Sequence, residues 1–471
     1  MNSAGQSIRD PRQLLIAVGA GSYASTLALI RTPEQALLWI SPPGLCAAFA
    51  WILLSPNSWL PVFFAALLLL PPLPIPIGDS GPHLAVGLAL MGLLSGSLRW
   101  KQWRLHPDLL TSSFGLFTGL LTVSIALALI TAGPWIALNS LARVCLFAIG
   151  FYIYLFVSSG MLGQIQPMRW ARYLFFLAIV AAGFACLDFY FQFPAPAQFG
   201  PQFVWLDSGV YRRAQGLFYE ASTLGNFCAF FLVMAALALP LPRNERPCSR
   251  LVLILGGSIL AAALIFSYSR ASLLNAAIAL LAMAYCRQIR WRRFLTLLSA
   301  SLFAGGWIVY LAFPSFSESY WRRLALSFEY FWTSPEGVLS GRLASWRLLA
   351  DFIWQHPLTL IFGVGYKTLP YTEVAGRPVI ADNMYLSLLV ETGFVGLAVF
   401  LLWNVAILRA SWQASRSQTQ SAKFYGTWIF CFWVGQMFQM LSGDLITYWR
   451  VLPVYFFVLG IAVLNTREAK T

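Results

Sequence analysis

Long apolar runs alternate with short polar segments along most of the chain. Most runs hold roughly 17–25 residues, the length with which an α-helix crosses a hydrocarbon layer about 30 Å thick. They predict helices at 14–30, 36–54, 59–77, 82–98, 114–132, 134–158, 172–193, 217–240, 251–268, 270–286, 294–313, 383–408, 425–441 and 446–464. The third run ends in a proline-rich stretch, residues 71–76, where we expect its helix to break. The pattern predicts an all-α, polytopic transmembrane helix bundle of about 12–14 helices.

Composition and charge agree with a membrane protein. The chain is 59% hydrophobic and 10% charged, whereas soluble domains are about 45–50% apolar and about 25% charged. Its net charge of +14 is concentrated in short loops between apolar runs. When the N-terminus is placed in the cytoplasm, every short basic loop falls on the cytoplasmic side, which also places the C-terminus there. Because no basic run alternates with aromatic residues on a soluble domain, we exclude a nucleic-acid partner.

Two segments on the opposite, outer side exceed the length of a simple connection: residues 194–216 and 314–382. The longer one contains an amphipathic pattern, Arg342 to Trp354, with apolar residues at helical spacing. An aromatic stretch, 320–332, is typical of a segment that lies along the membrane interface. These features divide the chain into four parts: N-terminal transmembrane helices 1–200, transmembrane helices 201–313 with arginine motifs, a large outer loop 314–382 and C-terminal transmembrane helices 383–471.

Charged residues at the outer ends of the apolar runs are the candidates for chemistry. An unpaired charge inside the membrane costs at least about 2.5–3.5 kcal/mol, so such residues need a reason to be there. Arg213 precedes the eighth run, Glu220 lies one turn into it, and Arg270 lies in a tight turn between two runs. Arginine forks suit a diphosphate or another anion, although Arg213 alone could also be an interfacial anchor.

A second group of polar residues opens the twelfth run. Asp382 and Asn383 are adjacent there, and Glu391 lies about two turns deeper. A carboxylate at this place could accept a proton from an attacking hydroxyl. Two structural alternatives stay open, since Asp382 could cap the helix and Glu391 could be a partner inside the bundle. We also expect Arg143 and Asp188, at similar depth in the sixth and seventh runs, to pair as a structural bridge.

The sequence predicts neither a metal site nor a cofactor. Its three histidines, His83, His106 and His356, are isolated, and its cysteines lack the spacing of metal ligands. Walker, dinucleotide-binding and catalytic metalloprotease motifs are missing, which argues against transport driven by ATP.

Four segments in a particular order resemble the O-antigen ligase/polymerase family of bacterial membrane proteins. They are Arg213-Ala-Gln-Gly-Leu-Phe, Ser269-Arg270-Ala-Ser, the region from Gly341-Arg342 through Trp346 and His356-Pro357 to Gly363-Val-Gly365, and Ala381-Asp382-Asn383-Met-Tyr385 continuing through Glu391-Thr-Gly393 to Gly396. The resemblance covers roughly residues 205–410.

The resemblance implies a fold similar to that of C-type glycosyltransferases, in the bacterial inner membrane, with the active site on the periplasmic face. Such proteins move a glycan from a polyprenyl-diphosphate carrier to a hydroxyl of another glycan, of lipid A-core or of a protein, without a metal or nucleotide cofactor and with inversion. By this resemblance Arg213 and Arg270 bind the carrier diphosphate, Asp382 activates the acceptor hydroxyl and Asn383 orients it. Arg342, Glu220 and Glu391 are supporting residues.

One departure from the family pattern bears on the activity. Ligases of the family have a histidine directly before the asparagine of the last motif, where this chain has Asp382. An aspartate is similar to what polysaccharide polymerases have, so we favour a polymerase over a ligase that acts on lipid A-core or protein. A transporter or flippase of lipid-linked sugars is a third hypothesis, but it predicts polar residues at mid-membrane depth and a repeated architecture. The charges of this sequence lie mainly on one side of the membrane, and it has no internal repeat.

Overall fold

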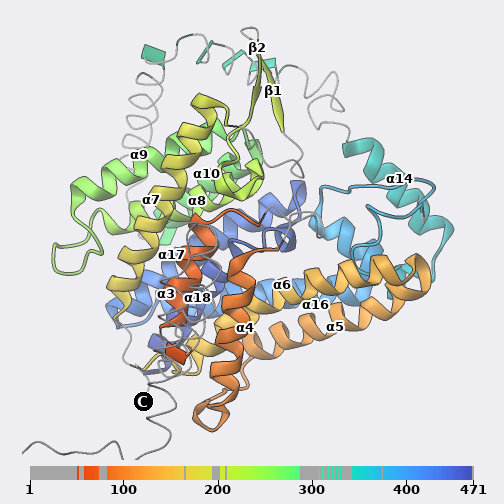
Figure 1. The fold of residues 1–471 in the computed structure, drawn as a ribbon, viewed down its shortest axis with the longest axis horizontal. Helices are drawn as coiled ribbons and strands as arrows, with labels where there is room; N and C mark the ends of the chain where they lie inside the picture. Colours follow the sequence, from red (N-terminus) through yellow and green to blue (C-terminus); the bar gives the residue numbers. More distant parts are fainter. Residues whose placement is uncertain are drawn as a thin grey trace, which may run out of the picture.

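A computed structural model describes the chain at 50–51, 58–73, 82–163, 166–193, 202–206, 209–286, 342–373 and 375–468, and at single positions between 307 and 329. The longer helices are α3 (Trp59–Leu69), α4 (Leu84–Ser97), α5 (Leu109–Ala132), α6 (Pro134–Ser158), α7 (Pro167–Phe191), α8 (Ala221–Ala238), α9 (Arg250–Phe266), α10 (Arg270–Cys286), α14 (Arg342–Gln355), α16 (Met384–Ser415), α17 (Gln420–Gln439) and α18 (Leu452–Glu468). Short elements are α15 (Thr359–Phe362), η1 (Trp100–Gln102), η2 (Gly216–Phe218), η3 (Met440–Ser442) and η4 (Leu445–Thr447). Figure 1 shows them as a bundle in which α5, α6 and α16 lie side by side.

The predicted all-α, multi-pass membrane architecture is confirmed. Within the described ranges, five helices are long and apolar enough to cross a membrane, namely α5, α6, α7, α8 and α16. The observed α6 and α10 have the bounds that their apolar runs predict. The predicted span 14–30, and most of 36–54 and 294–313, lie outside the described residues.

Local sequence determines where several helices begin. Asp108 caps α5 by accepting the Thr111 amide at 2.7 Å, and Pro134 opens α6 directly after Gly133, which has a φ of 86°. A proline in the first turn costs no hydrogen bond, because that amide has no partner inside the helix. A single glycine therefore joins two long antiparallel helices.

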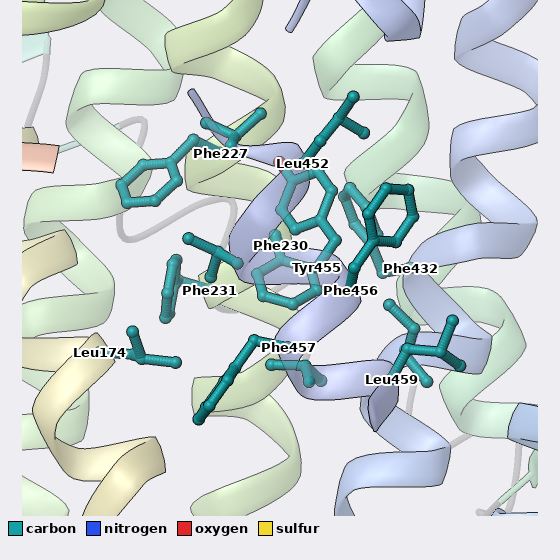
Figure 2. Close-up of a cluster of buried hydrophobic side chains, with 14 of the residues drawn as sticks. Leu174, Phe227, Phe230, Phe231, Phe432, Leu452, Tyr455, Phe456, Phe457 and Leu459 are labelled. Carbon is teal, nitrogen blue, oxygen red and sulfur yellow. The ribbon is translucent and has the colours of Figure 1, made fainter. Parts of the chain in front are cut away.

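The core centres on α18, which is apolar on all sides and enclosed by the other helices. Residues 454–459 of α18 are fully buried. Figure 2 shows their aromatic side chains among those of α8 and α17; the ring centroids of Phe230 and Tyr455 are 4.4 Å apart and those of Phe432 and Tyr455 4.8 Å. A buried amide network joins α8, α10 and α17, since Asn226 and Asn275 each donate to Oε1 of Gln439 at 2.8 Å. Such hydrogen bonds hold transmembrane helices together where water is absent.

Helix α3 ends before the proline-rich stretch, as expected, and its free end is bound by Arg450. The guanidinium donates Nε to the Leu67 carbonyl at 3.0 Å and Nη2 to the Leu70 carbonyl at 2.8 Å. It also donates Nη1 to the carbonyl of Leu217 in η2. The last carbonyls of a helix have no partner inside it, so Arg450 replaces the donors that the interrupted helix lacks.

The segment before α8 contains a β-hairpin that the sequence did not predict. Strands β1 (Phe203–Leu206) and β2 (Gly209–Arg212) pair antiparallel, with Phe203 opposite Arg212. Arg212 forms a buried ion pair with Asp188 of α7. The expected partner of Asp188 was Arg143, and this prediction was wrong: the hairpin supplies a cation near the end of α7, whereas Arg143 donates to the Tyr371 hydroxyl at 2.5 Å.

Candidate functional site

A cavity of about 1340 Å³ lies among α4, α6, the segment around β2, the loop before α16 and the segment between α17 and α18. This volume exceeds the roughly 300–1,000 Å³ of common small-ligand pockets. Its described wall carries four cationic and four acidic side chains: Arg143, Arg213, Arg342, Lys367, Glu220, Asp382, Glu391 and Asp444. Positive and negative charges are therefore balanced around the empty space.

Five of the seven residues selected from the sequence line this cavity. They are Arg213, Glu220, Arg342, Asp382 and Glu391, which come from segments up to about 180 positions apart in the chain. In the part of the chain that the structure describes, neither Arg270 nor Asn383 contributes to the wall. The fold thus gathers most, but not all, of the predicted residues around one space.

Arg213 is fixed against the turn that precedes Arg270. Its Nε donates to the Ser267 carbonyl at 2.8 Å, and the amide of the next residue, Ala214, donates to the Phe266 carbonyl at 2.9 Å. Arg270 is the first residue of α10 and its side chain is exposed. The two arginine motifs are therefore neighbours in space, and Arg213 is the one that lies in the described cavity wall.

Glu220 lies at the start of α8, where it accepts a hydrogen bond from the Thr223 hydroxyl at 2.6 Å. Burial raises the pKa of Glu220, while the hydrogen bond from Thr223 opposes this shift. The nearby charges of Asp444 and Asp382 raise the pKa further, and that of Arg213 lowers it. A carboxyl with a raised pKa inside a cavity is suited to exchange a proton.

Asp382 projects from a strained position of the backbone. Its φ of 46° lies in the left-handed region, which is uncommon for an aspartate and costs of the order of 1 kcal/mol or more. Two residues of α14 hold this conformation: Arg342 Nε lies 3.1 Å from Asp382 Oδ2, and Trp346 Nε1 donates to the Ala381 carbonyl at 2.7 Å. The predicted amphipathic helix is thus present, and it anchors Asp382.

Asn383, not Asp382, caps α16. Its Oδ1 accepts the amides of Tyr385 and Leu386, each at 3.1 Å. The alternative in which Asp382 serves only as the helix cap is therefore ruled out, and its carboxylate is available to the cavity and to Arg342.

Glu391 lies where α16 departs from helical geometry. Gly393 has a φ of 71° inside the helix, and the Glu391 carbonyl accepts the Gly365 amide at 2.9 Å instead of an amide of its own helix. Only glycine fits at Gly365, since a Cβ there would lie 2.4 Å from the Ala128 amide nitrogen of α5. The two glycines let the loop before α16 lie directly against α5 and the kink, next to the cavity.

Sequence reasoning missed Lys367 and Asp444, which form a buried ion pair in the cavity wall. Asp444 precedes an apolar run, as Asp382 does, so the same criterion could have found it. Lys367 lies in a loop between glycine-rich motifs, and only the fold reveals that its side chain turns inward.

The cavity continues as an apolar groove between α4 and α6. Its wall there consists of Val86, Ala89, Leu90, Leu93, Leu138, Leu141, Leu146 and Ile149. Leu90 and Leu138 are 57% and 54% exposed, which places the groove at the surface of the bundle. One continuous space therefore joins a charged end to an apolar face.

Comparison with protein families gives a match for one segment of the chain. Residues 255–401 match the family model described as O-Antigen ligase. This segment is therefore similar to an O-antigen ligase domain. The match runs from α9 to α16 and includes Arg270, Arg342, Asp382, Asn383 and Glu391. The match supports the assignment to the O-antigen ligase/polymerase family that was made from the motifs, and it supports a membrane glycan-transfer function. No curated protein matches the chain.

Proposed function

We propose that this protein is a metal-independent, inverting glycosyltransferase of the bacterial inner membrane that moves a glycan from a polyprenyl-diphosphate carrier to a sugar hydroxyl. Both termini lie in the cytoplasm, and the cavity faces the periplasm. Its activity is that of a polysaccharide polymerase, which makes O-antigen or exopolysaccharide. The observation that carries this proposal is that Arg213 and Asp382 share one cavity.

Each polar residue has a role in the transfer. Arg213, with the neighbouring Arg270, binds the carrier diphosphate and stabilises the charge that develops on the leaving group. Asp382 accepts the proton of the acceptor hydroxyl, whose oxygen attacks the anomeric carbon. The bond between this carbon and the phosphate oxygen breaks, and polyprenyl diphosphate leaves. Attack from the opposite side inverts the configuration.

The groove between α4 and α6 suits the polyprenyl chain of the carrier. It is apolar and runs without interruption into the charged end of the cavity. A polyprenyl diphosphate matches this arrangement, because it has an apolar chain at one end and an anionic diphosphate at the other. The substrate would therefore bind with its chain in the groove and its diphosphate at Arg213.

A ligase that transfers the glycan to lipid A-core or protein is the second candidate, because the matching family model is described as O-Antigen ligase. The glycans of cells that lack the gene separate the two. If short glycan units accumulate on the carrier and long chains are lost, the protein is a polymerase. If long chains accumulate on the carrier, it is a ligase.

Purified variants test the assigned residues. We expect Asp382→Asn to lower the rate of transfer about 10²–10⁴-fold, the usual contribution of a general base, without weakening the binding of polyprenyl diphosphate. Arg213→Ala should weaken that binding. Asp351→Asn, on the exposed side of α14, is the matched control and should leave both unchanged. Transfer by the Asp382→Asn protein at the wild-type rate would refute the proposal.

A further inference from the structure

Two buried polar atoms in the cavity wall lack a partner. Among the described residues, the Tyr366 hydroxyl and Glu391 Oε2 have no hydrogen-bond partner, although each residue is only 1% exposed and both line the cavity. A buried polar group without a partner costs about 1–3 kcal/mol. Such groups are rare in folded proteins, so two of them in one wall indicate that a ligand supplies the missing hydrogen bonds.

The backbone around these atoms is held firmly. The Tyr366 amide donates to the Ser124 hydroxyl at 2.9 Å, and its carbonyl accepts from the Ser140 hydroxyl at 2.7 Å. These contacts tie the residue to α5 and α6 through its main chain and leave the phenol hydroxyl unused. The site is therefore rigid before any ligand arrives, which reduces the entropy lost on binding.

The chemistry of the wall indicates the class of ligand. Burial raises the pKa of Tyr366, as do the charges of Asp444 and Glu391, so its hydroxyl keeps its proton and can both donate and accept. Lys367 lies beside it, with Nζ 5.8 Å from the ring centroid, but its charge is matched by Asp444. A carboxylate oxygen and a phenol hydroxyl next to a neutralised cation suit neutral hydroxyl groups better than a phosphate.

We propose that Tyr366 and Glu391 form a saccharide subsite, in which they hydrogen-bond the hydroxyl groups of a sugar ring of the glycan. This inference rests on the proposed function and adds a binding site to it. The subsite is distinct from the diphosphate site at Arg213. It selects the sugar and does not take part in the chemical step.

Direct binding to the purified full-length protein tests the subsite. The two probes are polyprenyl diphosphate without sugar and the lipid-linked glycan that accumulates in cells lacking the gene. We expect Tyr366→Phe to weaken binding of the lipid-linked glycan about three- to tenfold, the effect of one lost hydrogen bond. Binding of polyprenyl diphosphate should not change. Tyr285→Phe, an exposed tyrosine of α10, is the control.

Thermal unfolding distinguishes this role from a structural one. Since the Tyr366 hydroxyl has no partner among the described residues, Tyr366→Phe should leave the melting temperature unchanged or raise it. Glu391→Gln replaces the unpartnered oxygen by an amide donor, and it should also weaken only the glycan probe. Glu373→Gln, an exposed residue of the loop before α16, is its control. A lower melting temperature with unchanged glycan affinity in both cavity variants would overturn the subsite.

Steady-state kinetics, with the donor and acceptor concentrations varied separately, show whether the subsite binds the donor glycan or the acceptor glycan. A rise in KM for the donor places the ring of the donor glycan in the subsite, and a rise in KM for the acceptor places that of the acceptor there. If the wild-type protein binds both probes and transfers glycan, but Tyr366→Phe keeps full preference for the sugar-bearing probe, the subsite is refuted and the proposed function stands. If the wild-type protein binds neither probe, both are refuted.

Discussion

Replacing Arg450 by methionine tests whether one side chain holds the interrupted end of α3 in the bundle. Arg450 is 6% exposed and donates to three carbonyls, those of Leu67, Leu70 and Leu217. Burial lowers the pKa of Arg450 to about 9, so the side chain remains a cation at neutral pH. Methionine has a similar length and is apolar, but it has no donor.

The expected magnitude follows from the contacts that are lost. A buried carbonyl left without a donor costs about 1–3 kcal/mol. The Leu70 carbonyl keeps a partner in His83 Nε2 at 3.0 Å, so the carbonyls of Leu67 and Leu217 would together cost about 2–6 kcal/mol if the terms were additive. Removing a buried cation recovers part of this, because its desolvation is unfavourable by several kcal/mol. We therefore expect a net loss of about 1–3 kcal/mol in the free energy of unfolding.

Tryptophan fluorescence of the detergent-purified protein during heating measures the effect. Scans at one fixed rate are compared, since irreversible unfolding makes the melting temperature depend on the rate. Arg450→Met should lower the melting temperature by several degrees, and Arg450→Lys, which keeps a charged donor, should lower it less. Arg409→Met, an exposed arginine of α16, should have no effect. Equal melting temperatures for Arg450→Met and the wild type would refute the reasoning.

Two further predictions concern pH and the backbone. His83 accepts the Ala85 amide through Nδ1 at 3.1 Å, and burial, with the charge of Arg450, lowers the pKa of His83 to about 4. The neutral His83 side chain contributes its full stability above about pH 6.5, and this contribution falls by about 1.4 kcal/mol per pH unit as the pH decreases toward 4. His83→Asn keeps a helix cap that does not titrate, so its melting temperature should depend less on pH. Gly393→Ala should destabilise the protein by at least about 3 kcal/mol, because the added Cβ would lie 2.1 Å from the Ile361 carbonyl oxygen; wild-type expression and melting temperature would contradict this.

The sequence was sufficient for the transmembrane helices that the structure describes. The apolar runs 134–158 and 270–286 matched the observed helices because a membrane imposes one requirement, a continuous apolar stretch, that can be read locally. The residues at the outer ends of these runs also proved informative. Arg213 and Asp382 meet in one cavity, since charges at the ends of apolar helices must find partners or water.

Pairings across the fold could not be predicted in the same way. Asp188 pairs with Arg212 because a hairpin folds back onto α7, and a hairpin of two four-residue strands leaves little signal among apolar helices. Arg450 has no distinctive sequence context, and its role exists only because α3 ends beside it. Such contacts depend on which helix ends become neighbours, which composition and periodicity do not specify.

The contacts between α14 and the Ala381–Asp382 segment have a thermodynamic consequence. Arg342 and Trp346 belong to one helix and hold adjacent residues, so docking of this helix and occupancy of the carboxylate are linked equilibria. Linkage is reciprocal. A ligand that draws Arg342 away from Asp382 weakens the docking of α14, and the docking of α14 weakens the binding of that ligand by the same free energy. Hydrogen exchange at the amides of α14 would therefore report the state of Asp382 from a distance.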